Sequence, residues 1–255
     1  MFMTKFKKEL KKFLPALVLL ASVGQVVAGA TIAIGAFTGD SYNGLFTYTQ
    51  PAPFIFSIWG VIYTLAIIYG VYQVIPKNNN SYLEHNRMYA LIAFVGSGVW
   101  LCFAGTGDAL KWLTVPILIA VAYSLYKAVT VKTDDSVGMW ETVSSRKALF
   151  PYAAWTAIAM FVNIHTIVLQ YGIISSVMIN LILGLVLWAG IICVHSEILK
   201  RLNYSLWFGA VGIWALFGIV IANLLNQDGS IVVIVFSSIA CLYFIYLQIR
   251  KTKVK

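Results

Sequence analysis

The feature that most constrains this chain is a series of apolar runs, each long enough to cross a bilayer, that recurs along its whole length. A transmembrane helix needs about 20 predominantly apolar residues. The chain has 255 residues, of which 60% are hydrophobic and only 11% are charged. A soluble domain does not bury so large an apolar fraction. The sequence therefore predicts an all-α, polytopic membrane helical bundle.

The apolar runs define about eight transmembrane spans, and no connection between them is long enough to hold a soluble domain. Each run is long enough for one helix across the hydrocarbon core. The predicted spans are residues 13–37, 52–75, 88–107, 110–130, 149–170, 173–195, 205–224 and 230–248.

The predicted spans place nearly all of the basic residues on one side of the membrane. With both termini in the cytoplasm, Lys111 lies outside and the other 17 of the 18 Lys and Arg residues lie inside. This distribution agrees with the positive-inside rule, and removing one internal span would break it. We therefore expect a multi-pass protein of the cell (cytoplasmic) membrane with both termini cytoplasmic. The net charge of +9 then reflects topology, and no nucleic-acid partner is expected.

The N-terminal segment has a second interpretation. Basic residues followed by an apolar run and small residues are also typical of a cleaved signal peptide. The run continues from Thr31 to Phe37, which is longer than a signal peptide usually needs and favours a retained helix. Cleavage would leave seven helices with the later loops unchanged in orientation, so both alternatives stay open.

The predicted fifth span carries the most informative residues. Trp155, Ala159 and Asn163 recur every four residues, so they lie on one side of a helix. An Asn in hydrocarbon is costly unless it faces a cavity, a ligand or another helix. An indole, a small residue and an amide on one face are typical of a pocket wall.

The start of the second span carries a further group of aromatic residues. Phe56, Trp59 and Tyr63 share one helical face. Aromatic residues near a membrane interface usually form an aromatic belt, but Trp59 and Tyr63 continue at least a turn into the span. The sequence leaves both a belt and a pocket wall open.

The loop before the second span, residues 39–53, is rich in aromatic residues and proline. Phe46 and Tyr48 lie in it, and Pro51 and Pro53 stiffen the approach to the helix. Such a loop could cover the mouth of a pocket, or it could be an ordinary connector.

These segments resemble the tryptophan-rich sensory protein family (TspO/MBR, the translocator proteins). PAPFIFSIWGVIY is similar to that family's second-helix entry, in which a Tyr follows the Trp by four residues, as Tyr63 follows Trp59. PYAAWTAIAMFVN resembles its fifth-helix signature. The matching positions in that signature are Pro151, Tyr152, Ala154, Trp155, Ala159 and Asn163.

The resemblance covers about residues 13–170, because the family's typical members have five helices. Phe56 precedes Trp59 by three residues where the family has four, and Ser97 stands where the family usually has Asn. The resemblance therefore predicts two parts: a TspO-like five-helix membrane bundle in residues 1–170, and three further transmembrane helices with a basic cytoplasmic tail in residues 171–255.

The resemblance also implies a function. Family members bind porphyrins, haem and related tetrapyrroles, so a porphyrin or haem is the implied ligand, although no cofactor is required. A homodimer is implied as well, although the small residues of the first span could equally pack within one chain. The implied pocket residues are Trp59, Tyr63, Trp100, Trp155, Ala159 and Asn163. From the proline and aromatic residues of the preceding loop, we expect Phe46, Pro51, Pro53 and Phe56 to form a lid.

Catalysis is the weaker class of function. No Asp, Glu, Lys or Arg lies deep inside a predicted span, and no phosphate loop, clustered metal ligands or catalytic triad spacing is present in the sequence. His165 could ligate haem iron, but hydrogen bonding between helices is favoured. His195 is expected to be solvated at the end of the sixth span.

The leading hypothesis is a sensor-like or transport-like binding protein for a flat hydrophobic molecule. The alternatives are a transporter of small uncharged or amphipathic solutes and an enzyme acting on a bound porphyrin.

Overall fold

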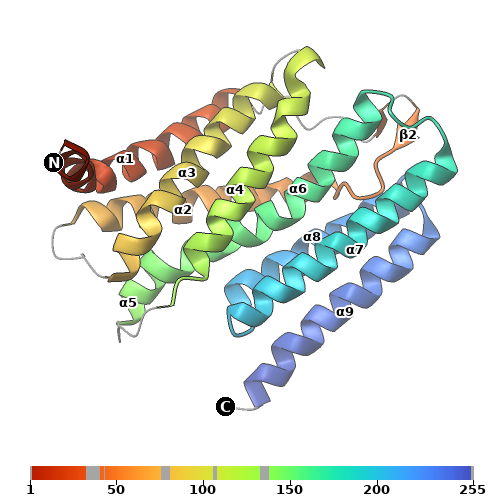
Figure 1. The fold of residues 1–255 in the computed structure, drawn as a ribbon. Coiled ribbons are helices and arrows are strands. Elements are labelled where there is room, and N and C mark those ends of the chain that lie inside the picture. The colour runs from red at the N-terminus through yellow and green to blue at the C-terminus, as the bar shows by residue number, and fades with distance from the viewer. Residues whose placement is uncertain are drawn as a thin grey trace.

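The fold is a bundle of long helices, seen here in a computed structural model that describes residues 2–32, 41, 42, 44–75, 81–105, 108–132 and 138–253 (Figure 1). Within these residues, eight helices are long and apolar enough to cross a membrane. This confirms the predicted polytopic helical bundle.

The elements follow the chain as a succession of helices with one small hairpin. In order they are α1 (Phe2–Ile32), β1 (Ser41–Tyr42), β2 (Leu45–Phe46), the 3₁₀ helix η1 (Pro53–Ser57), α2 (Ile58–Val74), α3 (Ser81–Ala104), the 3₁₀ helix η3 (Asp108–Leu113), α4 (Thr114–Val129), α5 (Met139–Glu141), the π-helix η4 (Thr142–Lys147), α6 (Phe150–Gln170), α7 (Val177–Arg201), α8 (Leu206–Leu225) and α9 (Ile231–Lys253).

Two helical spans begin earlier than the apolar pattern predicts. The third begins at Ser81 rather than at residue 88, because the polar residues of its first turns have partners inside the bundle. Tyr69 Oη donates to Asn86 Oδ1 at 2.7 Å, and Arg87 Nε donates to Gln73 Oε1 at 3.0 Å. The fifth span extends back to Met139 through α5 and η4. The last residues of the predicted first and third spans lie outside the described residues.

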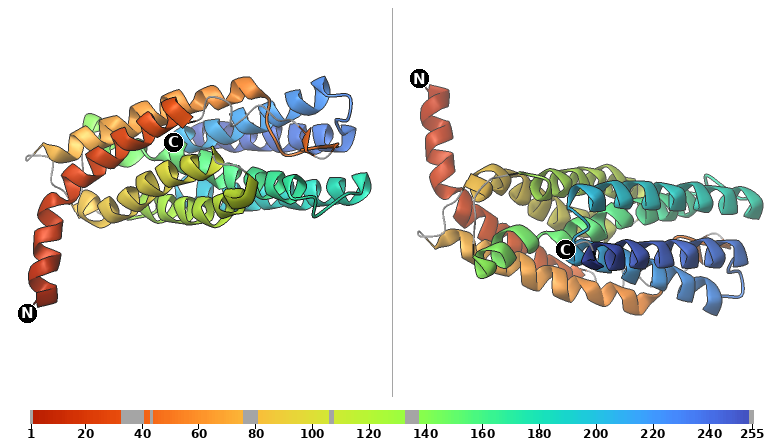
Figure 2. Two further views of the ribbon diagram at one scale, coloured as in Figure 1. Left: turned by 90° about the horizontal axis from the view of Figure 1, so that it is seen from above. Right: turned by 90° about the horizontal axis from the view of Figure 1, so that it is seen from below.

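Helix α6 lies between the helices that precede it in the chain and the helices that follow it, and it packs on both groups. On one side it packs against α4, and on the other it packs against α7 and α8. Helix α1 packs on both α2 and α3, α3 packs on α4, and α9 packs on α8 (Figures 1 and 2). Figure 2 also shows that α1 bends, so that its first turns leave the bundle, and Pro15 lies inside this helix.

Residues 45–52, which precede η1, are buried and held by hydrogen bonds. We call residues 44–52 the α1–α2 loop; Leu45 to Ala52 are all buried. Asn180 Nδ2 of α7 donates to the Phe46 carbonyl at 3.0 Å, and Asn223 Nδ2 of α8 donates to the Tyr48 carbonyl at 3.1 Å. Buried backbone groups need such partners, and α7 and α8 supply them.

The end of the α1–α2 loop and the following helix η1 pack closely on α8. The Ala52 N–H donates to the Gly218 carbonyl at 3.0 Å, and Trp214 Nε1 donates to the Ile55 carbonyl at 3.0 Å. A Cβ at Gly218 would overlap Ile55 and would lie 2.9 Å from Pro51 Cβ. Glycine at this position therefore allows the loop and η1 to dock on α8.

Replacing Gly218 by alanine should loosen this docking. Gly218→Ala introduces a Cβ into the Ile55 and Pro51 contact, and such overpacking typically costs about 1–3 kcal/mol. We expect a lower thermal unfolding midpoint for Gly218→Ala by circular dichroism in detergent. Gly60→Ala is the matched control, because a Cβ there meets no atom within 4 Å. Equal unfolding midpoints for the two variants would contradict the close docking.

Candidate functional site

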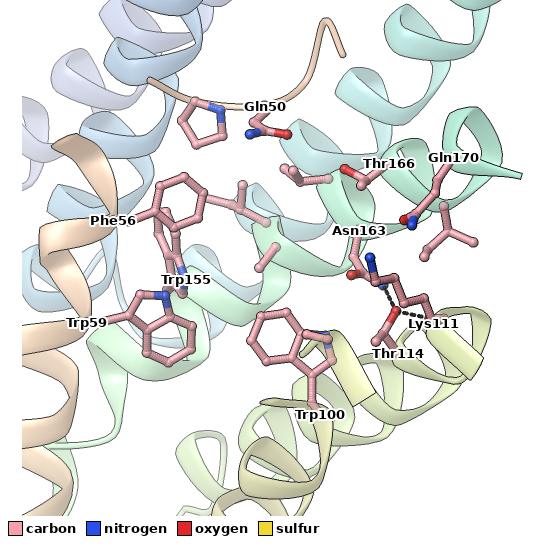
Figure 3. A pocket seen from close by; sticks show the side chains of 16 residues that line it. Gln50, Phe56, Trp59, Trp100, Lys111, Thr114, Trp155, Asn163, Thr166 and Gln170 are labelled. Carbon is pink, nitrogen blue, oxygen red and sulfur yellow. Dashed lines mark hydrogen bonds between the residues drawn. The ribbon is translucent and has the colours of Figure 1, made fainter. Parts of the chain in front are cut away.

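A cavity lies where α2, α3, α4 and α6 meet beneath the α1–α2 loop (Figure 3). The space between its walls, including the open solvent at its mouth, is about 840 Å³. The lining residues are Gln50, Pro51, Phe56, Trp59, Trp100, Ala104, Lys111, Thr114, Trp155, Ile158, Ala159, Val162, Asn163, Thr166, Ile167 and Gln170.

One end of the cavity is aromatic. Trp155 meets Phe56 edge-to-face, with ring centroids 5.5 Å apart, and meets Trp59 in the same way at 6.3 Å. Trp59 and Trp100 lie nearly parallel, with centroids 6.5 Å apart and planes inclined by 23°. These four residues, from η1, α2, α3 and α6, form an aromatic cluster. Its ring faces and edges can receive a flat apolar molecule.

The other end of the cavity is polar. Asn163 Nδ2 donates to Thr114 Oγ1 at 3.0 Å, and Thr114 Oγ1 donates to the Lys111 carbonyl at 2.6 Å (Figure 3). Thr166 and Gln170 also lie at this end, while Gln50 lines the cavity from the α1–α2 loop (Figure 3). The cavity is therefore amphipathic, with an aromatic end and a hydrogen-bonding end.

Most of the residues predicted to bind a ligand line this one cavity. Trp59, Trp100, Trp155, Ala159 and Asn163 do so, and of the predicted lid Pro51 and Phe56 do so as well. Tyr63, Phe46 and Pro53 do not. The geometry gathers these residues at one place, while ligand binding by them stays a prediction.

Tyr63 and Phe46 pack elsewhere in the bundle, and Pro53 is exposed to solvent or lipid. Tyr63 turns toward α1, where a Cβ at Gly29 would lie 2.8 Å from Tyr63 Oη. Phe46 is buried and packs edge-to-face on Tyr48 at 5.5 Å. Pro53 is exposed at the start of η1. Spacing along one helix did not reveal that Tyr63 faces a neighbouring helix.

Sequence reasoning missed the polar end of the cavity. Thr166 and Gln170 extend the face that carries Asn163 by three and then four residues, so the helical pattern contained this signal. Lys111 was already distinguished as the one basic residue on its side of the predicted membrane. Thr114 and Gln50 come from segments that only the fold brings to α6.

His165 fixes the α1–α2 loop. Its Nδ1 lies 2.9 Å from Thr49 Oγ1 and its Nε2 lies 2.7 Å from Asn180 Oδ1, so both ring nitrogens are in hydrogen bonds. His165 does not line the cavity. These contacts agree with hydrogen bonding between segments rather than ligation of haem iron.

The expectation that His195 is solvated is wrong. Its side chain is fully buried and lies between the rings of Phe208 and Phe244, with centroids 4.4 and 5.0 Å away. Gly212 of α8 lets the imidazole approach the helix backbone closely. Helices α8 and α9 cover this end of α7, which a single-span pattern could not show.

The loop also approaches the connection between α8 and α9. Burial raises the pKa of the Tyr48 hydroxyl, and the negative charge of Asp228 raises it further. Asn223 Oδ1 accepts the Ser230 N–H at 3.2 Å while the same amide holds the Tyr48 carbonyl. One asparagine thus fixes two loops at once.

The cavity has no ready ligand for a metal. Among the described residues that line it there is no His, Cys, Met, Asp or Glu. Across the described part of the chain, no group of three or more His, Cys, Asp or Glu residues could hold a metal ion. Any ligand in this cavity would therefore be held by stacking, burial and hydrogen bonds.

The fold and the cavity together define an integral membrane protein of helical-bundle type with an aromatic cluster at membrane depth. The sequence profile of the family described as TSPO-like protein matches residues 13–249, and the chain belongs to this family. No curated protein and no solved structure gives a match. The matched range runs through α7, α8 and α9, beyond the motifs that end near residue 170. The division at residue 170 stays a prediction.

Loss of the Asn223 side chain should release the loop from the cavity. Asn223→Ala leaves the Tyr48 carbonyl and the Ser230 N–H without that amide, at a cost of about 1–3 kcal/mol for buried groups. We expect a several-fold faster reaction of a Gln50→Cys reporter with a water-soluble maleimide, measured with the three native cysteines replaced. Gln227→Ala, at an exposed position nearby, is the control. Unchanged labelling in Asn223→Ala would show that the amide does not hold the loop.

Proposed function

We propose that the cavity binds a flat hydrophobic ligand of the tetrapyrrole or porphyrin type, in a sensor-like or transport-like role. The observation that carries this proposal is the convergence of Phe56, Trp59, Trp100 and Trp155 on one cavity wall. Membership of the TSPO-like family supports it. Aromatic faces recognise planar molecules through stacking and apolar burial.

Each lining residue of α6 has a proposed role. Trp155 stacks on or against the flat ligand, while Ala159 leaves room one turn further along the helix. Asn163 supplies a hydrogen bond; one of its amide N–H groups already contacts Thr114, and the amide has a second N–H and a carbonyl. Pro51 covers the cavity from the α1–α2 loop.

We propose binding rather than catalysis, with no required cofactor. The described lining residues offer stacking surfaces, amides, hydroxyls and one amine, but no carboxylate or imidazole for acid–base chemistry. For a haem ligand, the same set offers no imidazole or thiolate to the iron. The enzyme alternative predicts turnover of a bound porphyrin in the dark that depends on Trp59 or Trp155.

We place the protein in the cell membrane with both termini cytoplasmic, which puts Lys111 on the outer side. The distribution of 17 of 18 basic residues on one side supports this orientation. The apolar helix faces contact lipid; exposed Leu, Ile and Val side chains along α7 and α9 support this. A homodimer is proposed from the family resemblance alone.

The proposal predicts a specific titration result. Protoporphyrin added to purified protein in detergent should quench tryptophan fluorescence saturably at micromolar concentration. A Trp155→Phe, Asn163→Leu double variant should bind at least tenfold more weakly, because it loses an indole surface and an amide hydrogen bond, each contributing about 1 kcal/mol or more. Trp140→Phe is the control, since Trp140 is exposed outside the cavity.

Two results would count against this function. Equal, non-saturating quenching in the wild type and the double variant would mean that porphyrin partitions into micelles. Equal loss of binding in the Trp140→Phe control would mean that quenching does not report on the cavity.

The transporter alternative has one structural observation in its favour. Because Gly218 and Asn223 of α8 bond to the loop over the cavity, and Trp214 of α8 bonds to Ile55 of η1, a movement of α8 would move that loop. Saturable solute uptake into proteoliposomes that is lost in Trp155→Ala would favour transport. Ligand quenching without uptake would favour the binding protein.

A further inference from the structure

His195 is a buried ionisable residue that the proposed ligand site does not use. It belongs to α7, and its ring lies between Phe208 of α8 and Phe244 of α9. Neither ring nitrogen has a hydrogen-bond partner among the residues that the structure describes. Ionisable side chains inside a membrane bundle are costly and usually have a function.

The imidazole packs directly on the backbone of α8. A Cβ at Gly212 would overlap His195 Nε2, and a Cβ at Gly209 would overlap Nε2 of Gln248 from α9. Gly209 and Gly212 are three residues apart, so they lie on one face of α8. At this end of the bundle, α7 and α9 therefore approach α8 through two polar side chains packed against glycine.

The titratable groups of α7 and α8 offer no anion to His195. The Glu197 carboxylate is more than half exposed and accepts from Arg201 Nε at 2.9 Å. Lys200 is exposed, and Tyr204 in the turn after α7 is partly buried. Helix α8 has no titratable side chain. A positive charge on the ring would therefore gain no ion pair from these two helices.

The same holds for the described parts of α9 and α6. On α9, the Cys241 thiol faces the Ile213 carbonyl of α8 at 4.0 Å. Three further titratable residues of α9 are exposed: Tyr243, Tyr246 and Arg250. On α6, the Tyr152 hydroxyl donates to Gln25, and His165 bonds to Thr49 and Asn180.

A proton on His195 would create a cation that this packing does not compensate. The flanking phenyl rings attract a cation, but an imidazolium has two N–H donors, and neither nitrogen has an acceptor among the described residues. A buried charge without a partner strongly destabilises the structure around it. The arrangement seen here therefore suits the neutral ring.

Movement of α8 away from α7 would expose the ring to water. An exposed imidazole takes up a proton with a pKa of about 6.5. Acid favours the form that binds more protons, so each pH unit below this value favours the open form by up to a further factor of about ten. The closed form is favoured at neutral pH and above.

Helix α8 connects this end of the bundle to the loop that covers the cavity. Gly218 lies six residues after Gly212, roughly 9 Å along the helix. Its carbonyl accepts the Ala52 N–H at 3.0 Å, and Trp214 Nε1 donates to the Ile55 carbonyl at 3.0 Å. A displacement of α8 at His195 would therefore pull on the α1–α2 loop and η1.

We propose that His195 is a proton-binding site that controls the cover of the cavity. The neutral ring holds α8 against α7 and α9, and uptake of a proton releases α8 and with it the α1–α2 loop. This inference goes beyond the proposed function and does not rest on it, because it concerns the opening of the cavity and not its ligand.

The first test follows α8 directly, by ¹⁹F NMR of the full-length protein labelled with 5-fluorotryptophan. The Trp214 indole bonds across to η1, so its resonance reports whether α8 is docked. Between pH 7.5 and pH 5.0 in detergent, we expect this resonance to shift or to be replaced by a second signal. In His195→Phe and His195→Gln, neither of which titrates, it should stay as it is at pH 7.5.

An exposed histidine provides the matched control. His85 Nδ1 lies 2.6 Å from the Ser81 carbonyl in α3, away from α8. His85→Gln should keep the wild-type response, and His165 is present in every variant, so its titration is common to all. The two replacements of His195 differ in shape and polarity, and a wild-type Trp214 resonance at pH 7.5 identifies a folded variant.

The second test follows the loop. With the three native cysteines replaced, a Gln50→Cys reporter is labelled by a water-soluble maleimide with and without His195→Phe. Comparing the two proteins at one pH removes the effect of pH on the thiol itself. We expect labelling to be several-fold faster with His195 present at pH 5.5, and equal in the two proteins at pH 7.5.

Three results would overturn the inference. A wild-type Trp214 resonance that stays unchanged down to pH 5.0 would show that α8 does not respond to acid. The same response in the His195 variants would assign it to another group. A Trp214 response with equal labelling in the two reporters would show that α8 moves without the loop. None of these measurements uses a ligand, so each leaves the proposed porphyrin site untouched.

Discussion

The requirement that buried backbone groups find hydrogen-bond partners is the constraint on which the rest of this structure depends. A loop that enters a membrane bundle brings carbonyl and N–H groups that water cannot satisfy. Asn180 and Asn223 donate to the loop carbonyls of Phe46 and Tyr48, and the Gly218 carbonyl accepts the Ala52 N–H. The helices that supply these groups, α7 and α8, follow the segment that carries the TspO-like motifs. They complete the environment in which a buried loop is stable.

The buried loop in turn completes the cavity. Gln50 and Pro51 line it from the loop, while α6 supplies Trp155 on one side and His165, which bonds to Thr49, on another. Helix α6 therefore acts in both halves of the chain, since one of its faces forms the cavity wall and the other packs on α7 and α8. Helices α7 and α8 have a physical role in this arrangement, which is to position the loop above the aromatic cluster.

The sequence was sufficient for features that repeat along one helix. Apolar length predicted the eight spans, and four-residue spacing placed Trp155, Ala159 and Asn163 on one face, which the structure turns toward the cavity. Contacts between segments far apart in the chain could not be predicted from the sequence. Tyr63 lies on the same helix as Trp59 but packs against Gly29, and His195 is covered by helices that a pattern of single spans does not place. Pairings such as Asn163 with Thr114 arise only when the helices assemble.

The most direct test of the ligand site is ¹⁹F NMR of protein labelled with 5-fluorotryptophan, titrated with protoporphyrin. The chain has eight tryptophans, so single replacements can assign every resonance. We predict saturable shifts for Trp59, Trp100 and Trp155, which line the cavity, and unchanged resonances for the exposed Trp140 and for Trp188 between α7 and α9. Shifts that grow in proportion to porphyrin concentration at all eight positions, without saturation at the three cavity residues, would contradict this prediction.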